Sequence, residues 1–222
     1  MSEPVPARRD APAASAAPAS AHEAPMEALR ETLHRGFGVV FAPFARLLGQ
    51  AGVSPNQLSV AGAALNAAAA ALVVAGRPVA AGALYLFGGG FDMMDGLLAR
   101  ITGRESALGA FLDSTLDRVS EGVVFAALAY VFAVDGGALD AAAVVLALLL
   151  SGLVSYVRAR AEGLGLSCRV GLFTRPERVV LLAAGLMAGF AAEAVWLLAA
   201  LSAFTVVQRV IHTGHQIAGT RP

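Results

Sequence analysis

The sequence contains no lysine and a single cysteine, and charged residues make up only 14% of its 222 residues. A soluble domain of this size carries about a quarter charged residues. Because 57% of the residues are hydrophobic, the composition predicts a membrane protein rather than a soluble one. Cys168 alone can form neither an intrachain disulfide nor a cysteine metal cluster. All basic residues are arginine and the formal net charge is zero, so nothing favours nucleic acid as a partner.

The chain divides into four segments by composition. Residues 1–25 are rich in Ala, Pro and Ser and lack a continuous apolar run, which predicts a disordered tail. Residues 26–50 repeat apolar side chains at helical spacing with arginines between them. This pattern predicts an amphipathic juxtamembrane helix in the membrane interface, with a packed amphipathic helix as the alternative. Residues 51–215 are expected to form one six-helix domain, and residues 216–222 a C-terminal tail.

Six membrane-spanning helices are expected. Ser54 followed by Pro55 is a helix-start signal, and the apolar run over about residues 56–75 has the roughly 20 residues that a bilayer requires. Further helices are expected over about residues 79–100, 108–134, 139–160, 176–192 and 194–211. The predicted fold class is therefore an all-α, polytopic membrane protein with six transmembrane helices plus an N-terminal amphipathic interfacial helix.

The placement of arginine predicts the orientation of these helices. The loops after the first, third and fifth spans contain one arginine between them, and the other fifteen of the sixteen fall on the opposite side. The positive-inside rule then places both termini, together with the loops at 101–107 and 161–177, in the cytoplasm. We expect a multi-pass protein of the plasma membrane or inner membrane.

Two helical stripes of aspartate form the candidate site. Asp92 and Asp95 lie three residues apart on one predicted helix, and Asp113 and Asp117 lie four apart on the next. The connection is short, so the helices should be antiparallel neighbours whose acidic stripes meet at the cytoplasmic face. Like charges at membrane depth are costly unless a cation compensates them. Oxygen ligands without histidine or cysteine favour Mg²⁺ or Mn²⁺.

Two other interpretations of the aspartates stay open at this point. They could pair with Arg100, Arg104 and Arg118 and so hold helices together. They could also belong to a carrier that moves ions or protons through intramembrane carboxylates. The acids lie at one end of their helices rather than at the bilayer midplane, which argues against a transport path.

The aspartates are part of a longer pattern, Asp92-x2-Asp95-Gly96-x2-Ala99-Arg100-x8-Gly109-x3-Asp113-x3-Asp117, with eight fixed residues over 26 positions. It resembles the signature of the CDP-alcohol phosphotransferase family at every defined position. The resemblance implies a six-helix membrane enzyme, usually a homodimer, that uses two divalent ions to displace CMP from a CDP-linked lipid. It also implies roles for the fixed residues: metal ligands at Asp92, Asp95, Asp113 and Asp117, a general base at Asp117, and contacts to CDP from Gly96, Ala99, Arg100 and Gly109.

A second region resembles phosphatidylinositol-phosphate synthases and archaetidylinositol-phosphate synthases. It comprises residues 155–162 and 175–178. This resemblance implies that the phosphatidyl group of CDP-diacylglycerol is transferred to inositol phosphate, held by Ser155, Arg158, Arg178 and Arg209. The chain departs from the subfamily pattern at Arg158, Thr174 and Glu121, where lysine, an acid and aspartate are common.

Several arginines beside a metal site favour an anionic acceptor on physical grounds as well. The alternative is that they follow the positive-inside rule and contact lipid headgroups. Relatives that use glycerol 3-phosphate remain the alternative enzyme class.

Overall fold

The computed structural model describes residues 24–135, 137–168 and 170–219, and within these ranges the chain forms seven α-helices and no β-strand. The helices are α1 (Ala24–Gln50), α2 (Pro55–Val74), α3 (Pro78–Thr102), α4 (Ala107–Val134), α5 (Ala138–Gly163), α6 (Arg175–Ala188) and α7 (Ala191–Gly219). All seven correspond to predicted helices, so the all-α prediction is confirmed.

Local capping determines where the helices begin. The backbone N–H of Gln57 donates to Ser54 Oγ at 3.3 Å, and Gln57 Oε1 accepts from the Ser54 N–H at 2.8 Å, which closes a capping box in front of α2. Ser106 Oγ accepts from the Gly109 N–H at 3.0 Å at the start of α4. Each of these hydrogen bonds joins two residues that are only three apart in sequence. The starts of α2 and α4 could therefore be predicted closely from the sequence alone.

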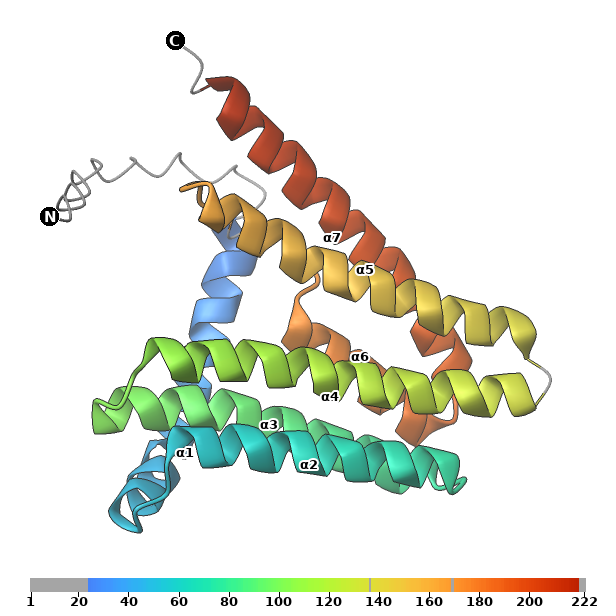
Figure 1. The fold of residues 1–222 in the computed structure, drawn as a ribbon, viewed down its shortest axis with the longest axis horizontal. Helices are drawn as coiled ribbons and strands as arrows, with labels where there is room; N and C mark the ends of the chain where they lie inside the picture. Colours follow the sequence, from blue (N-terminus) through green and yellow to red (C-terminus); the bar gives the residue numbers. More distant parts are fainter. Residues whose placement is uncertain (1–23, 136, 169, 220–222) are drawn as a thin grey trace, which may run out of the picture.

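The helices pack around one large apolar core. Helix α2 contacts α3 and α4, α3 also contacts α1 and α6, and α5 connects α4 to α7 (Figure 1). The fully buried side chains at the centre include Phe125 and Leu128 of α4, Leu182 of α6 and Leu198 of α7. A Cβ on Gly185 would lie 2.3 Å from the Ala194 Cβ, so this glycine permits the close packing of α6 on α7.

The surface of the helical body is apolar. Val60, Phe87, Leu149 and Phe204 lie on four different helices and are each more than half exposed. Exposed apolar side chains on many helices suit contact with lipid. By length and composition, three of the described helices, α2, α5 and α7, can cross a membrane. The six-span topology stays a prediction, because α3 and α4 carry charged residues and α6 has 14 residues.

The two ends of the chain differ from the prediction. The expected tail over residues 1–25 lies outside the described residues up to residue 23, and Ala24 and Pro25 already belong to α1. The last helix was expected to end near residue 211 but continues to Gly219, so most of the predicted 216–222 tail is helical. This end of α7 is polar, so the apolar pattern of the sequence did not predict that the helix continues there. Its Gln216 Nε2 donates to the Ser167 carbonyl at 2.7 Å, which holds it against the loop after α5.

Candidate active site

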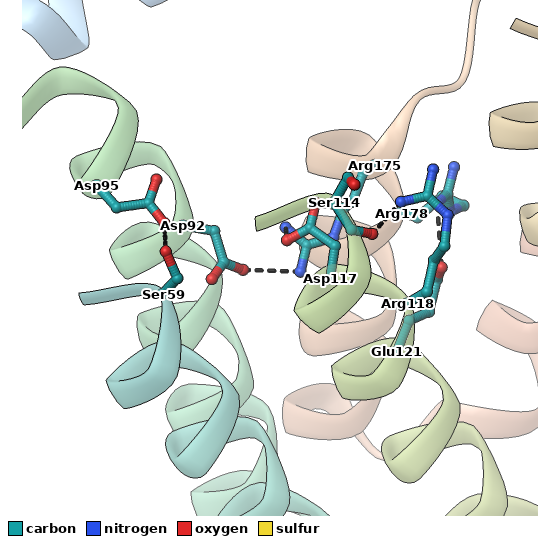
Figure 2. A network of polar contacts seen from close by, with 9 residues as sticks. All are labelled: Ser59, Asp92, Asp95, Ser114, Asp117, Arg118, Glu121, Arg175 and Arg178. Atoms are coloured by element: carbon teal, nitrogen blue, oxygen red, sulfur yellow. Dashed lines mark hydrogen bonds and ion pairs between the residues drawn. The ribbon is translucent and has the colours of Figure 1, made fainter. Parts of the chain in front are cut away.

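Asp95 lies at the contact between α3 and α2. It is buried, with 4% of its surface exposed, and its carboxylate accepts a hydrogen bond from the Ser59 hydroxyl of α2. Figure 2 shows this pair on the two neighbouring helices. Ser59 received no function from the sequence, although it lies one helical turn after the Pro55 that starts α2. Its position orients one carboxylate of the acidic stripe, and only the three-dimensional contact reveals this.

Glycines make room for the aspartates. A Cβ on Gly62 of α2 would lie 2.6 Å from Asp92 Oδ1, so the Asp92 carboxylate uses the space that this glycine leaves. Gly109 at the start of α4 approaches α2 similarly, since its Cβ would lie 3.2 Å from Asn56 Oδ1. The space beside Gly96 is open, and the nearest side-chain atom to its Cβ position is Arg100 Nη1 at 3.8 Å. The packing therefore needs a glycine beside Asp92 at Gly62, and it leaves open space at Gly96.

Arg175 joins the two acidic stripes. It is the first residue of α6, and its Nη2 donates to Asp92 Oδ2 at 2.7 Å while its Nη1 lies 2.8 Å from Asp117 Oδ1. Figure 2 shows the guanidinium between α3 and α4. The alternative with Arg100, Arg104 and Arg118 named the wrong partners for these two acids. The sequence placed Arg175 in an arginine-rich segment but gave no signal that it would reach aspartates 83 residues away.

Arg178 forms a second, deeper ion pair on α6. Its Nε donates to Glu121 Oε1 at 2.8 Å and its Nη2 to Glu121 Oε2 at 3.2 Å. Both residues are buried, with 2% and 6% exposed. Glu121 was noted only as a departure from the subfamily pattern, and the structure gives it a function as the partner that orients Arg178. The predicted contact of Arg178 with an acceptor is not tested by this arrangement.

The other residues predicted to hold the acceptor have separate environments. Arg209 is buried and donates to the carbonyls of Val170 and Val154 at 2.8 and 2.5 Å, which ties the loop before α6 to α5 and α7. Arg158 is exposed and pairs with Glu162 of the same helix at 2.8 Å. Ser155 is half-buried on α5. Their acceptor-binding role stays a prediction.

The donor atoms suit a hard divalent cation. Asp92 and Asp117 both face the guanidinium of Arg175, so these two carboxylates lie on the same side of the site. Asp95 is directed to Ser59, and Asp92 and Asp117 are held by Arg175. In the described ranges, no group of three or more His, Cys, Asp and Glu side chains is arranged around a common point. Carboxylate oxygens without nitrogen or sulfur ligands fit Mg²⁺ or Mn²⁺, but the ligand set stays a prediction.

The chain is similar to known lipid-synthesis enzymes over most of its length. The sequence of a phosphatidylinositol phosphate synthase from Corynebacterium glutamicum is 37% identical over 185 residues, which cover 79% of this chain and 84% of the relative. An archaetidylinositol phosphate synthase from Methanothermobacter thermautotrophicus is 38% identical over 169 residues, covering 73% of this chain and 84% of that protein.

Solved structures of Mycobacterium tuberculosis phosphatidylinositol phosphate synthase have the same fold. The structure with CDP-DAG bound superimposes with a TM-score of 0.71 at 32% identity, covering 77% of this chain and 92% of that one. The structure in complex with manganese and citrate gives a TM-score of 0.70 at 34% identity, covering 77% and 87%. The family model described as CDP-alcohol phosphatidyltransferase matches residues 52–211. This chain is a membrane transferase that belongs to the CDP-alcohol phosphatidyltransferase family.

Proposed function

We propose that this enzyme transfers the phosphatidyl group of CDP-diacylglycerol, or of a similar CDP-lipid, to inositol phosphate with release of CMP. The observation that carries the proposal is the meeting of two signature aspartates, Asp92 of α3 and Asp117 of α4, with Arg175 at the start of α6. The relatives with 37% and 38% identity are inositol-phosphate-type synthases, which supports this acceptor.

The proposed chemistry divides between the two helices and α6. Two divalent ions, Mg²⁺ or Mn²⁺, would be held by the four signature aspartates, Asp92, Asp95, Asp113 and Asp117. A bound ion would neutralise negative charge on the phosphates of the CDP-lipid. Asp117 accepts the proton of the attacking hydroxyl as general base. The new bond joins the acceptor oxygen to the lipid phosphorus, and the bond to CMP breaks.

The residues around the aspartates would bind the two substrates. Gly96, Ala99, Arg100 and Gly109 border the CDP moiety in this proposal, and the open space at Gly96 supports that role. Arg178 is buried and fixed by Glu121, so its Nη1 edge is preoriented and can meet a phosphate without a large loss of side-chain entropy. Ser155, Arg158 and Arg209 complete the acceptor site.

The cellular setting is proposed from arginine placement. Both termini and the site face the cytoplasm of a plasma or inner membrane, which the enzyme spans six times. The resemblance to the family supports a homodimer. Exposed Val39, Val40, Phe44 and Leu47 on α1 support an interfacial position for that helix.

An acceptor assay tests the proposed function. Purified protein receives CDP-diacylglycerol and, separately, inositol phosphate, glycerol 3-phosphate, serine or free inositol, and CMP release is measured. We expect inositol phosphate to give the highest kcat/KM. A higher value with glycerol 3-phosphate would assign the chain to the alternative class, and CMP release that no acceptor accelerates would refute a transferase of this kind.

A further inference from the structure

The position of Arg175 raises a question about charge. Its two terminal nitrogens contact Asp92 and Asp117 at 2.7 and 2.8 Å, and its side chain is 21% exposed. Its Nε is buried and has no hydrogen-bond partner among the described residues. The guanidinium is therefore held at its outer end, by the two carboxylates, and these are acids that the proposed function assigns to a metal ion.

A guanidinium and a divalent ion compete for such carboxylates. Mg²⁺ needs its oxygen ligands at about 2.0–2.1 Å, in a nearly ideal octahedron. A guanidinium that already lies between Asp92 and Asp117 occupies this space, and its positive charge repels an ion that approaches the same oxygens. Full pairing with Arg175 and full coordination of an ion therefore exclude each other.

Resting on the proposed function, we infer that Arg175 is an internal counter-cation: it neutralises Asp92 and Asp117 in the ion-free enzyme, and it must leave them when a divalent ion binds. Its presence lowers the affinity for the ion and prevents the aspartates from repelling one another when the site holds none.

The exchange requires a side-chain movement and no movement of α6. Arg178, one turn further along, anchors the helix through its buried pair with Glu121. The start of the helix is fixed by Glu177, whose carboxylate accepts from the Thr174 N–H at 2.8 Å and from its hydroxyl at 2.5 Å. The backbone at Arg175 is thus held on both sides, while its long side chain has the rotamers to change partner.

Direct measurement of ion binding tests this inference. Mn²⁺ is titrated into the purified full-length protein in detergent, without CDP-lipid or acceptor, and bound ion is followed by electron paramagnetic resonance. Arg175→Ala should bind Mn²⁺ about tenfold or more tightly than the wild type, the scale of losing one charge-assisted hydrogen bond. Arg175→Lys should stay near the wild type. Arg160→Ala, which removes an exposed arginine from the end of α5, serves as the control and should leave the affinity unchanged.

Thermal unfolding provides the second measurement. Without ion, Arg175→Ala leaves two carboxylates uncompensated and should unfold at a lower temperature than the wild type, whereas Mn²⁺ should raise its unfolding temperature by more than it raises that of the wild type. Arg175→Gln removes the charge but keeps a polar side chain, and it should show the same two changes as Arg175→Ala. It replaces the alanine variant in both measurements if that variant does not fold.

The outcomes separate the two proposals. Equal or weaker Mn²⁺ affinity in Arg175→Ala and Arg175→Gln, with measurable binding to the wild type, overturns the counter-cation role and leaves the metal site intact. Mn²⁺ binding to neither the wild type nor the variants overturns the metal site itself. Tighter binding that Asp92→Asn abolishes supports both.

Discussion

Replacing Arg178 with alanine tests a residue that has both a structural partner and a proposed substrate. The side chain is buried and makes two hydrogen bonds to Glu121, at 2.8 and 3.2 Å. Removal leaves the Glu121 carboxylate buried without its counter-charge, and breaking a buried pair in this way costs about 3–5 kcal/mol of stability. If Arg178 also contacts the acceptor phosphate, the loss of about 1.5–3 kcal/mol there raises the KM for inositol phosphate roughly ten- to a hundredfold.

The double variant Arg178→Ala/Glu121→Ala separates the two effects. It removes the stranded carboxylate, so most of the lost stability should return, as measured by thermal unfolding in detergent. The raised KM for the acceptor should persist, and the affinity for CDP-diacylglycerol should remain near that of the wild type. An acceptor KM that returns to the wild-type value together with stability would refute the reasoning, because Arg178 would then act only by supporting the fold.

Three further predictions test other parts of the proposal. EDTA should abolish activity and Mg²⁺ or Mn²⁺ should restore it, so full activity in thoroughly chelated protein would contradict a metal site. Asp117→Asn should lower turnover by at least the roughly 10²–10⁴-fold of general-base loss while CDP-lipid binding survives; normal CMP release by a folded variant would exclude Asp117 as the base. Single cysteines at residues 77, 135 and 104 are introduced in a Cys168→Ser background. Those at 77 and 135 should react with a membrane-impermeant reagent outside intact cells, and the one at 104 should not. The reverse pattern would show that the predicted topology is inverted.

Helix positions were largely predictable because their signals are local. The apolar runs are continuous along the chain, and the caps at Ser54 and Ser106 act over three residues. The prediction was wrong at Gly219, where α7 ends, because the polar last turns of that helix have no apolar run. They are held by a contact between Gln216 and Ser167, which are 49 residues apart.

The acidic residues of the site could be predicted from the sequence, but the arginines that pair with them could not. The spacing of the aspartates on two helices indicated their common side, and the resemblance supplied their expected roles. No spacing rule indicates that Arg175 reaches Asp92 across 83 residues, or that Arg178 reaches Glu121 across 57. The sequence contains many arginines on the same predicted side, so composition cannot choose among them. Only the packing of α6 against α3, which brings both arginines within reach of α4, selects these two.

Arg175 and Arg178 of α6 each neutralise acidic side chains, and they differ in how deeply they are buried. They lie three residues apart on one helix, yet the side chain of Arg178 is 2% exposed and that of Arg175 is 21% exposed. A deeply buried pair such as Arg178–Glu121 cannot separate without leaving an unpaired charge, so it serves as a fixed anchor. The pairs of Arg175 are less deeply buried, since the side chains of Asp92 and Asp117 are 9% and 20% exposed, so they separate at lower cost than the Arg178–Glu121 pair. One turn of helix thus places a permanent cation beside an exchangeable one, and only the exchangeable one contacts the signature aspartates.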